Sequence, residues 1–239
     1  MSTKTLVESI PSQLRLSFNI EKIDNLFPGF TLGNFAVLRG SSAVMPLSML
    51  LCVRAQLPYQ LGGLETNVVF VDGGNTFRLY DVSYIAQIQE LDPRNVLEKI
   101  FISRAFTAYQ MTSLILDKLQ ATVEKYDSKL VVISDIAELY LDKDVPKRET
   151  RDVFNQLTVH LSKFAKENHV IVVATYLPHY PSDRNIFFKA IACGRANVVA
   201  LVKPSRHGQQ FVLEKHPFFK LGSIDFPSEN LTLTQFMEA

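Results

Sequence analysis

The sequence has little that would bind a metal or form a disulfide. It contains only two cysteines, Cys52 and Cys193, and both stand in apolar surroundings without the spacing of metal ligands. We therefore expect two buried free thiols in a reducing compartment. The five histidines show no metal-ligand spacing either, so the sequence predicts no metal site.

Long apolar runs and an excess of one charge are also missing. No apolar run approaches the roughly 18 residues that a membrane helix needs, and the N-terminus lacks a basic segment followed by an apolar one. The formal net charge of +1 gives no field over the whole protein that would attract nucleic acid or membrane. With 47% hydrophobic residues and no repeat or linker-like tract, the chain is expected to form one cytoplasmic (intracellular) globular domain.

What the sequence does contain is an alternation of apolar strands and amphipathic helices. We expect strands at residues 35–38, 68–72, 100–103, 130–133 and 170–174, and helices at residues 17–30, from 46 onward, and at 78–90, 110–126 and 151–168. After residue 174 only two strands are expected, at residues 198–202 and 211–214, with no further helix. This order predicts an α/β fold with a mostly parallel twisted sheet, helices on both faces and antiparallel strands at the C-terminal edge.

The stretch from Gly33 to Gln56 has the frame of a phosphate-binding site. A strand leads through a glycine loop into an apolar helix, which is where the motif G-x-x-x-x-G-K-[ST] occurs. Counted from Gly40, the eight residues are Gly-Ser-Ser-Ala-Val-Met-Pro-Leu. Met45 replaces the second glycine, Pro46 the lysine and Leu47 the hydroxyl residue. An unrelated strand, loop and helix without nucleotide ancestry is the alternative.

The replacements remove most of what holds a phosphate. A lysine ammonium about 4 Å from a phosphate oxygen gains on the order of 4 kcal/mol at an effective dielectric near 20, which is roughly a thousandfold in affinity. Met45 places a side chain where backbone must approach the phosphate closely. Pro46 removes an N–H from the anion cradle but suits the first turn of a helix. The sequence therefore predicts a preserved helix start without its anion-binding use.

Several fragments in the rest of the chain follow a recognisable order. The strand ending at Asp72 continues as Gly-Gly-Asn-Thr-Phe-Arg, and further fragments lie at residues 103–110, 129–133, 171–175 and 211–218. Together they resemble the RecA-superfamily recombinases, of the archaeal RadA and RadB type. The resemblance implies a RecA-like core at residues 17–220, an N-terminal extension at 1–16 and a C-terminal tail at 221–239. The N-terminal helical DNA-binding domain of the full recombinases has no counterpart in it.

The resemblance also identifies positions whose usual chemistry is absent. Gly74 stands where the family has the glutamate that activates water, and Ser134 stands where an aspartate supports magnesium. Thr175-Tyr-Leu177 replaces the Thr-Asn-Gln sequence whose glutamine senses the phosphate. The resemblance therefore implies no ATPase activity and no cofactor.

Asp135 follows Ser134 directly. A shift of one residue along a strand turns a side chain to the opposite face, so only a local bulge would bring Asp135 to the site. The alternative is an aspartate at a strand end that caps a turn.

Positive charge gathers in the last third of the chain. Residues 176–220 hold seven lysines and arginines against two acidic residues, a net charge of +5, interleaved with Tyr180 and other aromatics. Such a mixture suits single-stranded DNA through phosphate neutralisation and base stacking. The resemblance places the two DNA loops of the family at Lys143, Lys147, Arg148 and Arg151 and at Arg184, Phe187, Phe188, Lys189 and Arg195. The alternative is a solvated surface with ordinary core aromatics.

The last four residues have the form F-x-x-A, with Phe236 and Ala239, by which recombinase subunits and their partners dock. A second match at residues 187–190 shows that chance produces such matches in a chain with 17 phenylalanines. The partners that the resemblance implies are an active RadA-type recombinase or another paralog subunit, in a homo- or hetero-oligomer.

The function expected from these observations is that of a catalytically inactive RecA-fold recombinase paralog. It would act in homologous recombination and DNA repair by binding DNA, an active recombinase, or both. Three alternatives stay open, since a fold by itself does not determine function. They are an atypical ATPase that uses Ser41, Ser42 and Asp135, a scaffold subunit without DNA contact, and a KaiC-like regulatory module.

Overall fold

The structure is a computed structural model that describes residues 14–143, 145, 147–206 and 208–227. Its centre is an eight-stranded sheet of order β10-β9-β8-β3-β7-β6-β4-β5. The strands are β3 (Phe35–Gly40), β4 (Asn67–Asp72), β5 (Ile100–Arg104), β6 (Ser128–Ser134), β7 (Ile171–Tyr176), β8 (Val198–Ser205), β9 (Gly208–Lys215) and β10 (Gly222–Phe226). The neighbouring strands β8, β3, β7, β6, β4 and β5 run parallel to one another. Strand β9 pairs antiparallel with β8 and with β10. The predicted α/β class and its antiparallel edge are confirmed.

The parallel strands are apolar along their length because helices cover both faces of the sheet. In β3, Ala36 and Leu38 belong to the core on one face, while Phe35 and Val37 belong to the core on the other. The alternation follows from the two-residue period of a strand. Each continuous apolar run in the sequence therefore supplies two cores at once.

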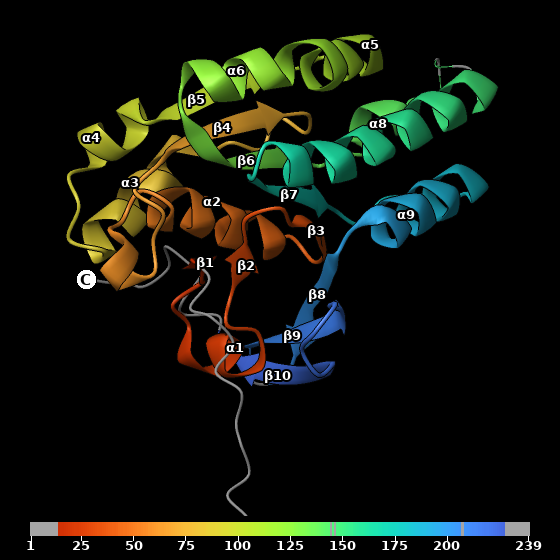
Figure 1. Cartoon of the computed structure of the whole chain (residues 1–239). Helices are drawn as coiled ribbons and strands as arrows, with labels where there is room; N and C mark the ends of the chain where they lie inside the picture. Colours follow the sequence, from red (N-terminus) through yellow and green to blue (C-terminus); the bar gives the residue numbers. More distant parts are fainter. Residues whose placement is uncertain (1–13, 144, 146, 207, 228–239) are drawn as a thin grey trace, which may run out of the picture.

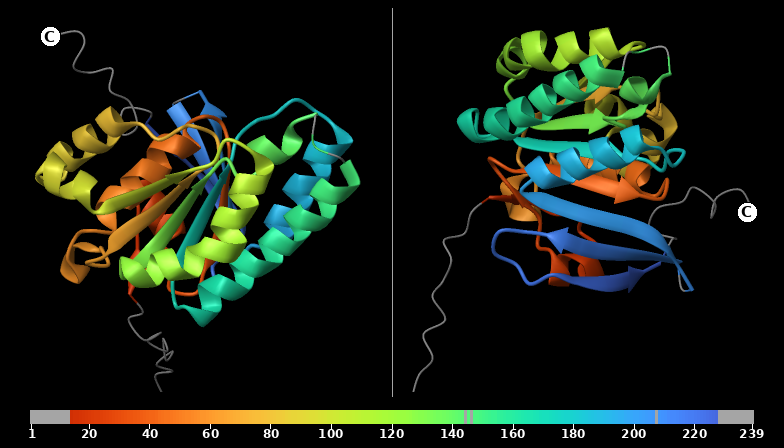
Figure 2. Two further views of the ribbon diagram at one scale, coloured as in Figure 1. Left: turned by 90° about the horizontal axis from the view of Figure 1, so that it is seen from above. Right: turned by 90° about the vertical axis from the view of Figure 1, so that its right-hand side faces the viewer.

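One face of the sheet packs against α1 (Glu21–Leu26), α2 (Val44–Arg54), α3 (Leu79–Ile88) and α4 (Pro93–Glu98). The other face packs against α5 (Ala108–Ser113), a π-helical turn (Leu114–Lys118), α6 (Leu119–Lys125), α7 (Glu138–Leu141), α8 (Lys147–Glu167) and α9 (Asp183–Arg195). Figure 1 shows α5, α6 and α8 on the far side of the sheet from α1 and α2. Figure 2 shows α8 and α9 running side by side.

Helix α9 corrects the prediction that helices end after residue 174. Its 13 residues begin after Ser182, whose hydroxyl oxygen accepts a hydrogen bond from the Asn185 N–H at 3.1 Å. Two of its apolar residues, Phe188 and Ala192, are buried four positions apart. This spacing is that of one helix face.

Both ends of the predicted core differ in detail from the structure. Strand β10 lies beyond the boundary expected at residue 220, and it extends the sheet by pairing with β9. A helix was expected at residues 17–30, but only α1 is helical. The chain after it forms β2 (Phe30–Thr31), which pairs with β1 (Arg15–Leu16). Phe236 and Ala239, predicted to dock partners, lie outside the described residues.

Both thiols are free. Cys52 is fully buried, and burial raises the pKa of its thiol; Cys193 is only half-buried, contrary to expectation. Among the helices that the structure describes, none is long and apolar enough to span a bilayer.

Candidate functional site

The loop after β3 is closed by hydrogen bonds within the protein. Gly40 has a φ of 116°, and a Cβ there would lie 2.0 Å from the Val202 carbonyl oxygen, so only glycine fits. The Ser41 N–H donates to that same carbonyl at 2.8 Å. The N–H groups of Val44 and Met45 donate to the carbonyls of Ser41 and Ser42 at 3.1 and 3.0 Å. These three N–H groups are therefore taken by protein carbonyls.

The three residues at the motif positions belong to the helix and the core. Helix α2 begins at Val44, so Pro46 stands in its first turn, where proline is tolerated. Leu47 is fully buried, at the position where the motif has a hydroxyl. The Met45 sulfur lies 3.5 Å from the Thr175 hydroxyl at the end of β7. The Met45 side chain therefore extends from the start of α2 to the end of β7.

The end of β4 is built around a buried carboxylate. Asp72 stands opposite Ser134 in the parallel register and accepts a hydrogen bond from its hydroxyl at 2.7 Å. It also accepts from the Thr76 N–H at 2.9 Å and forms an ion pair of 3.1 Å with Arg104. Asp72 and Ser134 thus close the turn after β4 in a network of hydrogen bonds.

Asp135 lies directly after the end of β6. Strand β6 ends at Ser134, and Asp135 takes a left-handed conformation with a φ of 39°. Its side chain is 3% exposed and lies against Gly74, where a Cβ would stand 3.0 Å from the Asp135 Cβ. The left-handed residue thus turns the carboxylate toward the position that lacks its glutamate.

Two of the predicted DNA-binding residues lie in the interior. Arg184 is buried and its guanidinium donates to the carbonyls of Tyr140, Asp142 and Val145 at 3.2, 2.5 and 2.9 Å. Phe188 is fully buried and stacks on Phe154 with ring centroids 4.3 Å apart. Phe188 therefore has no exposed ring for base stacking, and the Arg184 guanidinium is engaged by protein carbonyls. Both lie on the face of α9 that packs against α8 and the sheet, one helical repeat apart.

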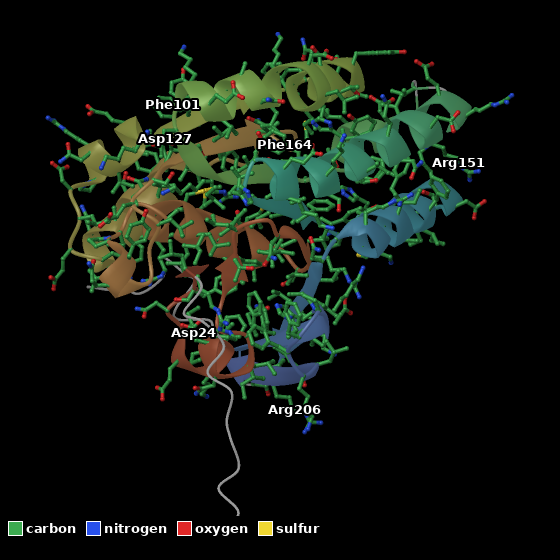
Figure 3. The ribbon with its side chains drawn as sticks, viewed as in Figure 1. Asp24, Phe101, Asp127, Arg151, Phe164 and Arg206 are labelled. Atoms are coloured by element: carbon green, nitrogen blue, oxygen red, sulfur yellow. The ribbon has the colours of Figure 1, made fainter. Side chains whose placement is uncertain are left out.

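The other predicted cations are on the surface. Lys143, Arg148, Arg151, Lys189 and Arg195 are exposed, while Lys147 begins α8 and its side chain lies outside the described residues. Arg151 lies over the half-buried Phe187 ring at 4.7 Å. Figure 3 shows Arg151 at α8 and α9, far from Arg206 at the turn between β8 and β9.

A cleft of about 1010 Å³ lies beside two of these cations, Lys143 and Arg151. Its lining comes from α7, from the segment that follows α7, from the segment at 179–184 and from Arg151 of α8. Tyr180, on its wall, is 88% exposed, so its ring is available for stacking. The cleft therefore combines exposed cations with a free aromatic ring.

Sequence reasoning missed one residue, His179. Its Nε2 lies 2.9 Å from an Asp135 carboxylate oxygen, and its Nδ1 lies 3.1 Å from a Glu138 oxygen. Burial lowers the pKa of His179, but the hydrogen bond and charge of Asp135 and the charge of Glu138 outweigh it, so the pKa is raised. The sequence signal that could have found His179 is its place after an apolar strand, since Asp135 and His179 follow neighbouring parallel strands.

Comparison with known proteins agrees with the fold. The Rad51 family model matches residues 24–189. The meiotic recombination protein DMC1 of Saccharomyces cerevisiae is 29% identical over 131 residues, which cover 55% of this chain and 39% of that protein. The DNA repair and recombination protein RadA of Aeropyrum pernix is 32% identical over 129 residues, covering 52% of this chain and 40% of that protein.

The chain thus spans about two fifths of the length of these curated relatives. The family match, by contrast, extends from α1 through strands β3 to β7 to the middle of α9. It confirms the resemblance to RecA-superfamily recombinases that the ordered fragments indicated. The chain belongs to the Rad51 family.

Proposed function

We propose that this chain is a catalytically inactive Rad51-family paralog that acts as an accessory factor in homologous recombination and DNA repair. It binds DNA, an active recombinase, or both, and ATP is not its switch. Recombination is the process named for both relatives, a meiotic recombination protein and a DNA repair and recombination protein. Cytoplasmic placement in the cell belongs to this proposal, as does assembly with a recombinase or a second paralog.

One observation carries the proposed inactivity: the N–H groups of the loop after β3 donate hydrogen bonds to carbonyls of the protein itself. A phosphate cradle needs several free N–H groups aimed at one anion. Here the N–H groups of Ser41, Val44 and Met45 are bonded to carbonyls, and Pro46 has none. No ammonium stands at position 46 to offset the phosphate charge. These residues do not fit a triphosphate.

The magnesium side of the site supports the same proposal. Magnesium is held by hydroxyl and carboxylate oxygens together with the phosphates. Leu47 is a buried aliphatic residue where the motif has a hydroxyl residue. The Ser134 hydroxyl donates its hydrogen bond to Asp72. Gly74 offers no carboxylate, and the Asp135 side chain fills the space beside it. These residues do not fit a magnesium ion bridging to a nucleotide.

The first prediction concerns turnover. The purified chain is expected to release no phosphate from ATP above the buffer rate, with or without single-stranded DNA. The reason is the loss of the lysine, the glutamate and the loop N–H groups together. Colorimetric phosphate release checks this, with an active RadA-type recombinase as the positive control. Phosphate release that disappears in D135N would instead support the atypical ATPase.

The second prediction concerns the partner. Immobilised chain is expected to retain a RadA-type recombinase from native extract, and nuclease treatment of the extract leaves the recovery unchanged. A complex that survives nuclease is held by direct protein contact, whereas two proteins that are joined only by binding the same DNA molecule would separate. Immunoblotting against the recombinase measures the recovery. Recovery only of proteins unrelated to recombination would favour the scaffold or the regulatory module.

A further inference from the structure

Asp135, Glu138 and His179 form a compact cluster at the carboxyl ends of two neighbouring strands. Asp135 follows β6, Glu138 begins α7, and His179 stands three residues after β7. The two ring nitrogens of His179 lie 2.9 and 3.1 Å from oxygens of Asp135 and Glu138. One potential ligand atom from each of the three residues lies within 4.8 Å of the others. The topology of the sheet, rather than sequence spacing, brings them together.

The charge of the cluster favours a cation. Two carboxylates surround one imidazole, so at least one negative charge is left over even when the ring carries a proton. Asp135 is 3% exposed and the His179 side chain 12% exposed, so water screens this charge only weakly. A divalent ion would neutralise the excess charge.

The buried ligand is already held in place. The Asp135 N–H donates to the Thr175 hydroxyl at 2.8 Å, and the Ile136 N–H donates to the Thr175 carbonyl at 3.0 Å. Both bonds fix the start of this segment to the end of β7. Together with the left-handed backbone of Asp135, they aim the carboxylate at His179 before any ion binds.

A second observation points to a missing ligand on the other side of Asp135. The Thr76 hydroxyl is buried and has no hydrogen-bond partner within the described part of the chain. The Thr76 methyl group and the second Asp135 oxygen both lie within 4 Å of one point above Gly74. A buried hydroxyl normally has a partner, and the residue that carries this one lies near the Asp135 side chain through its methyl group. A water on a bound ion would satisfy it.

We propose that Asp135, Glu138 and His179 bind one divalent transition-metal ion of the Zn²⁺ type. One imidazole with carboxylates suits Zn²⁺ and its late first-row neighbours, whereas Mg²⁺ prefers oxygen ligands alone. The ion sits between Asp135 and one ring nitrogen of His179. Glu138, whose side chain is 53% exposed, swings to complete the set. The ion ties the segment after β6 to the segment after β7, and both segments line the cleft that Tyr180 and Arg151 border.

Titration of metal-free chain with Zn²⁺ alone, followed by calorimetry, tests the proposal. One Zn²⁺ is expected to bind per chain, with affinity at least tenfold lower in H179Q and in E138Q. The control E124Q removes an exposed carboxylate from α6 and is expected to bind like wild type. Co²⁺ in place of Zn²⁺ is expected to give a visible absorption band that H179Q abolishes. Mg²⁺ in excess should leave both signals unchanged.

The proposal is overturned if Zn²⁺ does not bind saturably, or if H179Q binds it as tightly as wild type. In either case Asp135 and Glu138 would only form ion pairs with a protonated His179. H179Q and E138Q carry the test because each replaces a side chain by a polar one of similar size, and the Glu138 side chain is 53% exposed, so folding is expected to be retained, which circular dichroism verifies. The assay contains no nucleotide, DNA or partner, so its failure is distinct from failure of the proposed function.

Discussion

Reversing three exposed cations, in the variant K143E/R148E/K189E, is expected to weaken binding of single-stranded DNA at least a hundredfold. Lys143 lies before α8 and lines the cleft, while Arg148 on α8 and Lys189 on α9 are exposed at residues of the two predicted DNA loops. Each cation that no longer neutralises a phosphate leaves a condensed counterion on the DNA, and each introduced carboxylate adds repulsion. The salt dependence should also flatten, by roughly 0.7 in log–log slope for each phosphate that is no longer neutralised. Fluorescence anisotropy of a labelled oligonucleotide at several salt concentrations measures both effects.

The matched control for this variant is K22E/K99E/K118E. It changes the net charge by the same amount through exposed lysines on α1, after α4 and in the π-helical turn. The control is expected to lose less than fivefold in affinity, roughly 1 kcal/mol. An equal loss in both variants would mean that only the overall charge matters. Absence of DNA binding in the wild type would favour the scaffold without DNA contact.

Arg184 is left out of this variant for a structural reason. Its guanidinium donates to the carbonyls of Tyr140, Asp142 and Val145, so its removal would take three hydrogen bonds from that part of the chain. Loss of DNA binding in an Arg184 variant would then report on the shape of that segment. The surface cations test the electrostatic contribution to DNA binding without disturbing the interior.

The substitution F188A is expected to lower the free energy of unfolding by about 3–5 kcal/mol. Phe188 is fully buried, stacks on Phe154 of α8 and meets Tyr140 edge-on at 6.5 Å. Its removal leaves a cavity between α8, α9 and the end of α7. Urea denaturation followed by circular dichroism measures the change.

The neighbouring F187A is the control for F188A. Phe187 is half-buried under Arg151, so its truncation is expected to cost about 1 kcal/mol. An F188A variant as stable as wild type, with DNA binding reduced, would restore the base-stacking role predicted from the sequence. A large loss of stability confines Phe188 to the core.

Elements with a strong local signal agreed with the structure. Continuous apolar runs at β4, β6 and β7 predicted buried parallel strands, because a strand covered on both faces needs apolar residues at every position. Helix α8 was recognised because its apolar residues repeat at helical spacing. Helix α9 was missed because its apolar pattern is short and two prolines precede it.

By itself, the sequence determined that the lysine, the second glycine and the hydroxyl residue of the motif and the expected carboxylates are absent, since these are statements of residue identity. Only the tertiary structure decided where Arg184 and Phe188 point, because the buried side of a helix depends on what packs against it. It also decided that Asp135, Glu138 and His179 meet. Parallel strands distant in the chain end at one edge of a sheet, and no spacing along the sequence records that encounter.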